Sequence, residues 1–164
     1  MRGFTLLELL ITLAILAVLL TVALPGFSAQ INDARARSAG LSFYAAVMTA
    51  RNIARGQRVA TLLCPLAAGP AVASCGDDFS LGAVVMADRP SGPEVIRVWM
   101  LDEAVRVWNR TGSRPVDSVV RFEPSGLGNR NLTLSACAGG ANWALVLNRI
   151  GRPRLERDGG QCPN

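Results

Sequence analysis

A cluster of arginines near the end of the chain carries the chemistry best suited to binding another molecule. The segment Asn148–Arg157 reads NRIGRPRLER and contains Arg149, Arg152, Arg154 and Arg157. A guanidinium keeps its positive charge at physiological pH and binds phosphate through two hydrogen bonds. On an extended chain Arg152 and Arg154 project from the same face, about 7 Å apart, which matches adjacent phosphates of a nucleic-acid backbone. Phosphate binding is therefore one interpretation of this segment.

Turn and edge signals surround the same arginines. Asn148–Gly151 predicts a hairpin turn with Gly151 at a positive φ, and Pro153, which lacks an N–H, indicates an edge strand or a turn arm. Arg130, in the loop of residues 126–131, is expected to join Arg152 and Arg154. The alternative is an edge strand whose charges prevent aggregation between sheets, and the carboxylate of Glu156 weakens the positive field. The residues alone leave both interpretations open.

Residues for catalysis or metal binding are sparse. The chain has no histidine, the commonest general base and metal ligand, and its net charge of +5 comes from arginine alone. Its adjacent carboxylates, such as Asp77-Asp78 and Asp102-Glu103, occur without a glycine-rich phosphate loop, metal-ligand spacing or nucleophile motif. We therefore expect no enzyme activity, no metal site and no cofactor.

The stretch Phe4–Leu24 is apolar over 21 residues, with Glu8 as its only charge. A helix of that length spans about 31 Å, close to the hydrocarbon thickness of a bilayer, and it is longer than a secretory signal core. We expect a membrane anchor with the C-terminal body on the exported side, because Arg2 precedes the run. Glu8 either snorkels to the membrane interface or pairs with a charge on a neighbouring copy of the chain. Residue chemistry alone favours neither interpretation over the other.

A helical pattern continues beyond Pro25-Gly26, where the apolar run ends. Apolar residues recur at spacings of three, four and seven, which predicts one apolar stripe made of Phe27, Ile31, Ala34, Leu41, Ala45 and Met48. The helix is predicted to end near Arg55-Gly56. Arg51, Arg55 and Arg58 fall off the stripe, and a solvated helix face explains them better than a basic edge does.

From Val59 onward short β-rich runs are separated by Gly, Pro, Asp and Asn clusters. The runs are Val59–Leu63, Leu81–Ala87, Glu94–Leu101, Ala104–Trp108, Ser118–Phe122, Leu132–Ala136 and Trp143–Asn148. Their lengths predict an antiparallel sheet that covers the apolar stripe of the helix. The fold class is therefore α+β: a long N-terminal helix, transmembrane in its inner half and amphipathic in its outer half, packed on a C-terminal β domain.

The four cysteines predict two disulfides, because the body is expected on the oxidising side of a membrane. We expect Cys64 to pair with Cys75 and Cys137 with Cys162, since both sequential loops are local and sterically easy. In the loop-entropy model each bridge contributes about 3 kcal/mol. A zinc site is disfavoured by the absence of histidine and of Cys-x-x-Cys spacing.

The N-terminus resembles that of a known family. GFTLLE at Gly3–Glu8, the apolar run and the Pro25 that ends it resemble the class III leader and anchor of type IV pilins and type II secretion pseudopilins. In that family a prepilin peptidase cuts after the glycine and methylates the new N-terminal residue, which is Phe4 here. The resemblance implies that Glu8 acts in assembly of the filament.

The rest of the chain is similar to the GspH/FimT branch of minor pilins and pseudopilins, through the long helix, Cys64-Pro65 and the C-terminal GRPRL segment. In FimT-type members a GRxR motif binds DNA for uptake during natural transformation, and residues 151–154 match it residue for residue. The resemblance implies a DNA site made of Gly151, Arg152 and Arg154, supported by Arg149, Arg157 and Arg130. FimU-type members prime pilus assembly and GspH-type pseudopilins cap a secretion filament, and the match excludes neither.

The resemblance also implies an organisation and a location. Residues 1–3 are the leader, 4–28 the membrane or filament-core helix, 29–58 the amphipathic half of that helix and 59–164 the globular domain. The precursor is expected as a single-pass protein of the bacterial inner membrane with a periplasmic domain, and then in a pilus filament or at its tip. The implied partners are other major and minor pilins, the prepilin peptidase and DNA.

Overall fold

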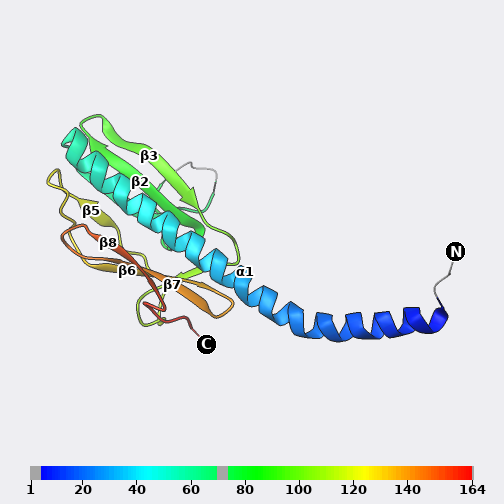
Figure 1. Ribbon diagram of the computed structural model, residues 1–164. Helices are drawn as coiled ribbons and strands as arrows, with labels where there is room; N and C mark the ends of the chain where they lie inside the picture. The colour runs from blue at the N-terminus through cyan, green and yellow to red at the C-terminus, as the bar shows by residue number, and fades with distance from the viewer. Residues whose placement is uncertain (1–4, 70–73, 164) are drawn as a thin grey trace.

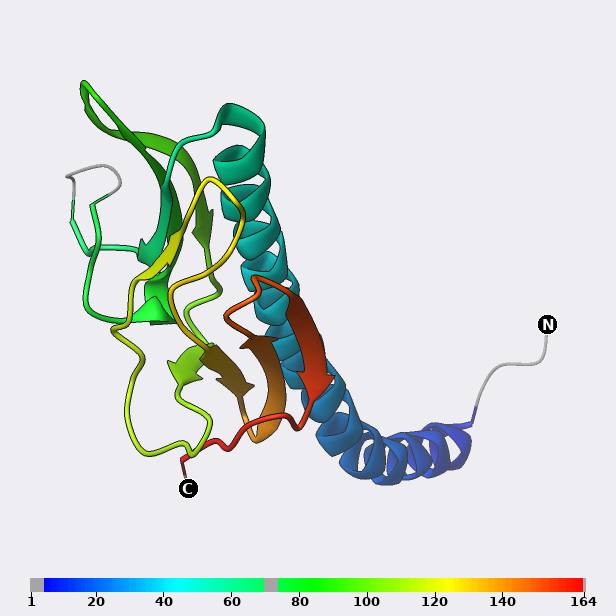
Figure 2. The same ribbon diagram turned by 90° about the vertical axis from the view of Figure 1, so that its left-hand side faces the viewer.

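The computed structural model describes residues 5–69 and 74–163, and one long helix, α1 (Leu6–Gln57), runs along the molecule. The first part of α1 projects away from the strands, and the second part lies along them (Figure 1). The helix bends where these parts meet, as Figure 2 also shows, and it passes through Pro25, which lacks the N–H of a regular helical bond. The predicted long N-terminal helix is confirmed.

The C-terminal end of α1 differs slightly from the sequence prediction. The helix continues through Gly56 to Gln57, and the left-handed residue that caps it is Arg58, with φ 55° and ψ 35°. A single left-handed residue other than glycine costs about 1–2 kcal/mol, so packing of the last helical turn can override the glycine signal. The predicted stop at Gly56 is therefore wrong by a residue or two.

In the described part of the chain, eight strands and a short 3₁₀ helix follow α1. They are β1 (Thr61–Pro65), η1 (Phe79–Leu81), β2 (Gly82–Arg89), β3 (Gly92–Met100), β4 (Arg106–Trp108), β5 (Val120–Phe122), β6 (Leu132–Ala138), β7 (Ala141–Leu147) and β8 (Pro153–Arg157). Each of the predicted β-rich runs overlaps one of β1 to β7. The run pattern did not include β8, although Pro153 indicated an edge strand there.

The strands form two four-stranded antiparallel sheets rather than one. Their orders are β3-β2-β1-β5 and β4-β6-β7-β8, so β8 is an edge strand of the second sheet. Helix α1 packs on both sheets (Figure 1). The α+β class and the antiparallel pairing are as predicted.

The face of α1 that contacts the sheets is not the predicted stripe. The buried positions are Ala36, Ala39, Phe43, Ala46, Val47, Ala50 and Ala54. In contrast, Phe27 is 67% exposed and Leu41 49% exposed. The buried stripe is rich in alanine because small side chains let the backbone of the helix approach the strands closely. Gly40 follows the same rule, since a Cβ there would lie 2.6 Å from Leu155 Cδ1.

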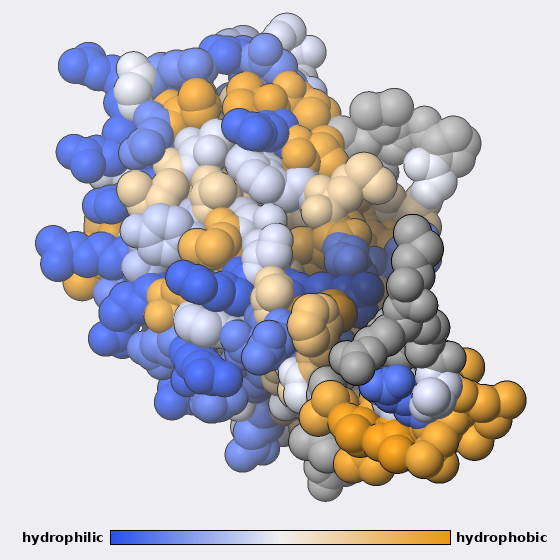
Figure 3. Space-filling view, turned by 45° about the vertical axis from the view of Figure 1, so that its right-hand side comes forward, coloured by the Kyte–Doolittle hydropathy of each residue, from blue (hydrophilic) through white to orange (hydrophobic). Residues whose placement is uncertain are grey.

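The projecting part of α1 carries most of the exposed apolar surface. Its exposed large residues are Leu6, Leu7, Leu9, Leu10, Ile11, Leu13, Ile15, Leu16, Val18 and Leu19. In Figure 3 this part appears as an orange region, while the adjoining globular surface is mixed and largely blue. Over the described residues, no helix combines the length and the apolarity that crossing a membrane requires.

Candidate nucleic-acid interface

The hairpin between β7 and β8 holds the arginines of the C-terminal motif. Gly151 has φ +75°, as predicted, and its N–H donates to the Asn148 carbonyl at 2.9 Å. The Asn148 side chain accepts a second bond, from the Arg152 N–H, also at 2.9 Å. The asparagine therefore closes the turn with both its backbone and its side chain, and it fixes the chain direction at Arg152.

A second loop, between β5 and β6, is tied to this hairpin. The Gly128 N–H donates to the Arg149 carbonyl at 2.9 Å, and the Arg149 N–H donates to Asn131 Oδ1 at 2.8 Å. Arg130 lies in the sequence between Gly128 and Asn131, the two residues that make these hydrogen bonds. The structure therefore places the backbones of Arg130 and Arg149, which are far apart in sequence, next to one another.

The last turns of α1 lie against both loops, which sequence reasoning missed. Arg51 is half-buried, and its Nε donates to the Gly126 carbonyl at 3.3 Å. A Cβ added to Gly151 would lie 2.5 Å from that same carbonyl oxygen. Figure 2 shows the loop and the turn on one side of α1. The sequence pattern predicts that Arg51 lies on a solvated helix face, because no local pattern indicates its contact with Gly126, 75 residues away.

Arg152 and Arg154 are both exposed, and Arg154 lies on the outer edge of the second sheet. The side chain of Arg154 is 74% exposed and has one long ion pair, 3.8 Å from Glu156 Oε1. Such a pair contributes little in water, so it leaves the guanidinium able to bind elsewhere. Arg154 pairs in register with Val146, whereas its neighbour Leu155 packs toward Gly40 of α1. Arg154 therefore faces away from the helix.

Arg157 lies on the helix-facing side of β8 instead. Its guanidinium pairs with Asp33 Oδ1 at 3.3 Å, and the same oxygen accepts a hydrogen bond from the Trp143 indole N–H at 3.1 Å. Arg37 adds its guanidinium over the ring of Trp143, 5.5 Å from the centroid. This network joins the end of β8 to α1. The structure therefore does not bring Arg157 together with Arg152 and Arg154.

The arginines of the globular domain differ in how far their charge is already neutralised. Arg121 pairs with Asp88 at 3.0 Å and with Glu123 at 3.4 Å, and Arg89 pairs with Glu94. Within the described part of the chain, no carboxylate lies within ion-pairing distance of Arg130, Arg149 or Arg152. These three, with Arg154, form a surface of net positive charge that suits an anion.

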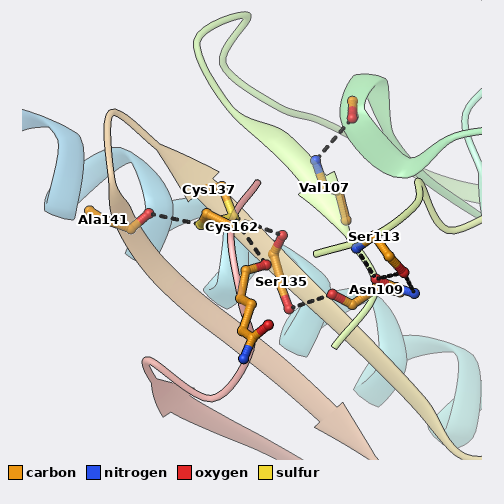
Figure 4. The surroundings of a disulfide bond; sticks show 9 residues. Val107, Asn109, Ser113, Ser135, Cys137, Ala141 and Cys162 are labelled. Carbon is orange, nitrogen blue, oxygen red and sulfur yellow. Dashed lines mark hydrogen bonds between the residues drawn. A yellow bond between two sulfur atoms is a disulfide. The ribbon is translucent and has the colours of Figure 1, made fainter. Parts of the chain in front are cut away.

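Both predicted disulfides are present. Cys64 pairs with Cys75, and Cys137 pairs with Cys162. Figure 4 shows the second bond, which attaches the C-terminal tail to β6 close to Ser135. Ser135 Oγ in turn donates to the Asn109 carbonyl at 3.3 Å. The tail and the loop that follows β4 are therefore both fastened to the second sheet.

The N-terminal site residues are only partly described. Gly3 and Phe4, the predicted cleavage site, lie outside the described residues. Glu8 forms a capping box at the start of α1: its backbone N–H donates to Thr5 Oγ1 at 3.3 Å, and its carboxylate accepts from the Thr5 N–H at 3.5 Å. The carboxylate thus sits at the N-terminal, positive end of the helix dipole.

Comparisons with known proteins agree with this architecture. Residues 1–24 match the prokaryotic N-terminal methylation motif, and residues 39–151 match the type II transport protein GspH. The GspH match ends at Gly151, so Arg152 and Arg154 lie beyond it. No curated protein sequence matches the chain.

Two solved structures share the fold at low sequence identity. The minor pseudopilin EpsH from the type 2 secretion system of Vibrio cholerae has a TM-score of 0.57 and 15% identity, over 76% of this chain and 98% of that one. The type IV minor pilin FimU from Pseudomonas aeruginosa has a TM-score of 0.57 and 20% identity, over 77% and 96%. With the family match spanning more than half of its residues, the chain belongs to the GspH family of minor pilins and pseudopilins.

Proposed function

We propose that this protein is a minor type IV pilin that binds DNA without sequence preference, for uptake in natural transformation. The observation that carries the proposal is the exposure of Arg152 and Arg154 on the free edge of the second sheet. A Gly-Arg-Pro-Arg motif in this position also matches the DNA-binding motif of FimT-type relatives. Arg149 and Arg130 support the site from the two tied loops.

The chemistry of the site favours backbone phosphates. Guanidiniums bind phosphate oxygens in a bidentate manner, and such contacts carry no base information. Four contacts, from Arg130, Arg149, Arg152 and Arg154, predict a slope of about −3.6 for log Kobs against log salt. Affinity should then fall about 150-fold between about 50 and 200 mM salt. Arg157 is left out of these contacts, because its side chain lies on the helix-facing side of β8, where it pairs with Asp33 of α1.

Gly151 has a separate role in this proposal. At φ +75°, and against the Gly126 carbonyl, the position accepts no side chain without a shift of backbone. The glycine of the motif therefore sets the geometry of the turn, while the two arginines that follow make the contacts.

A structural role is the second candidate, favoured by the shared fold with a FimU minor pilin and an EpsH pseudopilin. In that case the protein primes a pilus or caps a secretion filament, and the arginines protect the edge of β8 or meet an acidic neighbouring subunit.

We also propose a membrane-bound precursor that prepilin peptidase cleaves after Gly3, with methylation of Phe4 and with residues 29–164 in the periplasm. The match to the N-terminal methylation motif and the apolar run support this. Glu8 then acts in assembly with neighbouring pilins. Mass spectrometry of the membrane-extracted protein should show the methylated Phe4 terminus, and a protein that keeps Met1 contradicts the proposal.

The function is tested with the full-length, oxidised protein in a nonionic detergent, titrated into a labelled DNA duplex over a series of salt concentrations. The key variant is R152Q/R154Q. Its matched control is R35Q/R97Q, which removes two exposed arginines from α1 and from β3 of the other sheet. We expect the wild type and the control to bind alike, and the R152Q/R154Q slope to become shallower by about 1.8.

The outcomes separate the candidate functions. A wild-type protein that does not bind the duplex at low salt overturns the DNA proposal, and the structural role takes its place. Equal losses in the key variant and the control show that net charge alone matters, which overturns the assigned site. Thermal unfolding of each variant checks that its fold is intact.

A further inference from the structure

The face of the second sheet that points away from α1 carries a polar pocket, separate from the hairpin between β7 and β8. The pocket has a volume of about 240 Å³ and lies between the loop that follows β4 and the start of β6. Its polar lining comes from Asn109, Arg110, Thr111, Arg114, Asp117, Ser118, Asn131 and Thr133. Two of these are arginines, one is the carboxylate of Asp117, and the others carry hydroxyl or amide groups. The guanidinium, hydroxyl and amide donors among them suit an anion.

Strand register places this pocket on the same face as Arg154. Thr133 of β6 lies opposite Val146 of β7, and Val146 lies opposite Arg154 of β8. Residues opposite one another in antiparallel strands project from the same face, and neighbouring strands are about 4.8 Å apart. The backbone at Thr133, on the pocket wall, is therefore about 10 Å from that of Arg154 at the edge.

The side chain of Asn131 links the pocket to the hairpin directly. It lines the pocket, and its Oδ1 accepts the hydrogen bond from the Arg149 N–H. The other wall is equally well supported. Asn109 Oδ1 accepts bonds from the Ser113 N–H at 2.9 Å and the Thr111 hydroxyl at 3.2 Å, and the Asn109 carbonyl accepts from Ser135 of β6 (Figure 4). The loop is thus fixed in shape and fastened to the sheet.

The charges of the pocket favour an anion on balance. Arg110 and Arg114 are exposed, and within the described residues neither lies within ion-pairing distance of a carboxylate. Asp117 opposes them, although its carboxylate accepts a hydrogen bond from the Ser118 hydroxyl at 3.4 Å. Two guanidiniums against one carboxylate leave a net positive site.

We propose that this pocket is a second phosphate-binding site, in which Arg110 and Arg114 hold a backbone phosphate of the same DNA that Arg152 and Arg154 contact. The inference rests on the proposed function and extends its surface from the edge of β8 across β7 to β6. The DNA then crosses the strands of the second sheet instead of touching its edge alone. Two sites on one rigid sheet bind the same duplex more strongly than either does alone.

The test uses full-length protein in nonionic detergent and a labelled DNA duplex, with the salt series described above. The two pocket arginines bring the phosphate contacts to six, so the wild-type salt slope becomes about −5.4. R110Q/R114Q should bind more weakly and make that slope shallower by about 1.8, whereas R35Q/R97Q should behave as wild type. Asp117→Asn should bind more tightly at low salt, by severalfold, because it removes the opposing charge and keeps an oxygen for Ser118. A gain in affinity is a result that misfolding does not produce.

The variants distinguish this inference from the function on which it rests. If wild type binds DNA, R152Q/R154Q binds more weakly with a shallower salt slope, and both R110Q/R114Q and Asp117→Asn match wild type, the pocket is not a DNA site and the proposed function stands. If R110Q/R114Q and Asp117→Asn shift affinity in opposite directions while R152Q/R154Q has no effect, the pocket is supported and the edge site is overturned. Absence of wild-type binding overturns both.

Discussion

Replacement of Gly151 by alanine tests whether the hairpin is held against the rest of the domain. The residue has φ +75°, and a Cβ there would lie 2.5 Å from the Gly126 carbonyl oxygen and 3.3 Å from Arg51 Nε. The oxygen belongs to backbone, and it already accepts the hydrogen bond from Arg51. Relief of the clash therefore requires one of the two loops to move, not only a side chain.

Two contributions set the expected loss of stability. A left-handed conformation costs a non-glycine residue about 1–2 kcal/mol. Overpacking against well-placed neighbours costs typically about 1–3 kcal/mol. We expect Gly151→Ala to lower the free energy of unfolding by about 3 kcal/mol. For a chain of this size that corresponds to a fall in Tm of roughly 6–12 °C.

Thermal unfolding of the oxidised full-length protein, followed by near-UV circular dichroism, measures this effect. The matched control is Gly140→Ala, in the β6–β7 turn, because Gly140 has φ +91° but no atom within 4 Å of an added Cβ. The control variant has the cost of a left-handed backbone but no steric overlap of the added Cβ with a neighbour. Its Tm should therefore fall by about half as much or less. Equal falls in the two variants would refute the idea that contact with Gly126 constrains the hairpin.

Three further changes probe the core, a disulfide and the N-terminus. Phe43→Ala should lower the free energy of unfolding by about 3–5 kcal/mol, whereas Leu41→Ala should lower it by less than about 1 kcal/mol; denaturant titration measures both, and similar losses contradict the assigned helix face. Cys137→Ser with Cys162→Ser should lower the free energy of unfolding by about 3 kcal/mol, seen as a lower denaturant midpoint, and an unchanged midpoint shows that this disulfide adds no stability. Glu8→Gln should leave the Tm of the globular domain unchanged while filament incorporation, measured by immunoblot of sheared filaments, is lost; normal incorporation refutes an assembly role for this carboxylate.

Sequence reasoning succeeded where the physical cause is local. The turn at Gly151 follows from a four-residue pattern, and the edge position of β8 follows from a proline that lacks an N–H. Both disulfide pairings followed from short loops between the cysteines. Antiparallel pairing followed from the length and spacing of the β-rich runs.

Contacts between distant parts of the chain could not be predicted in this way. Arg51 and Gly126 are 75 residues apart, and nothing in either local pattern indicates that they meet. The separation of the strands into two sheets has the same origin, because β5 joins β1 while the neighbouring β4 joins β6. In each case the partner is fixed by packing of the whole domain, which a periodicity does not encode.

The wrong choice of helix face has a different cause, and it bears on assembly. The outer half of α1 has two apolar stripes, and the pattern gave priority to the larger residues, such as Phe27 and Leu41. The sheets instead take the alanine-rich stripe around Phe43, because close approach of backbones needs small side chains. The larger residues are left exposed, in line with the apolar surface of the projecting part of the helix.

Contiguous exposed apolar surface of this kind marks an interaction site, and members of this family associate with other pilins. Arg154 faces away from α1. Neighbouring subunits that cover the exposed side of the helix would therefore leave Arg154 free to bind a ligand.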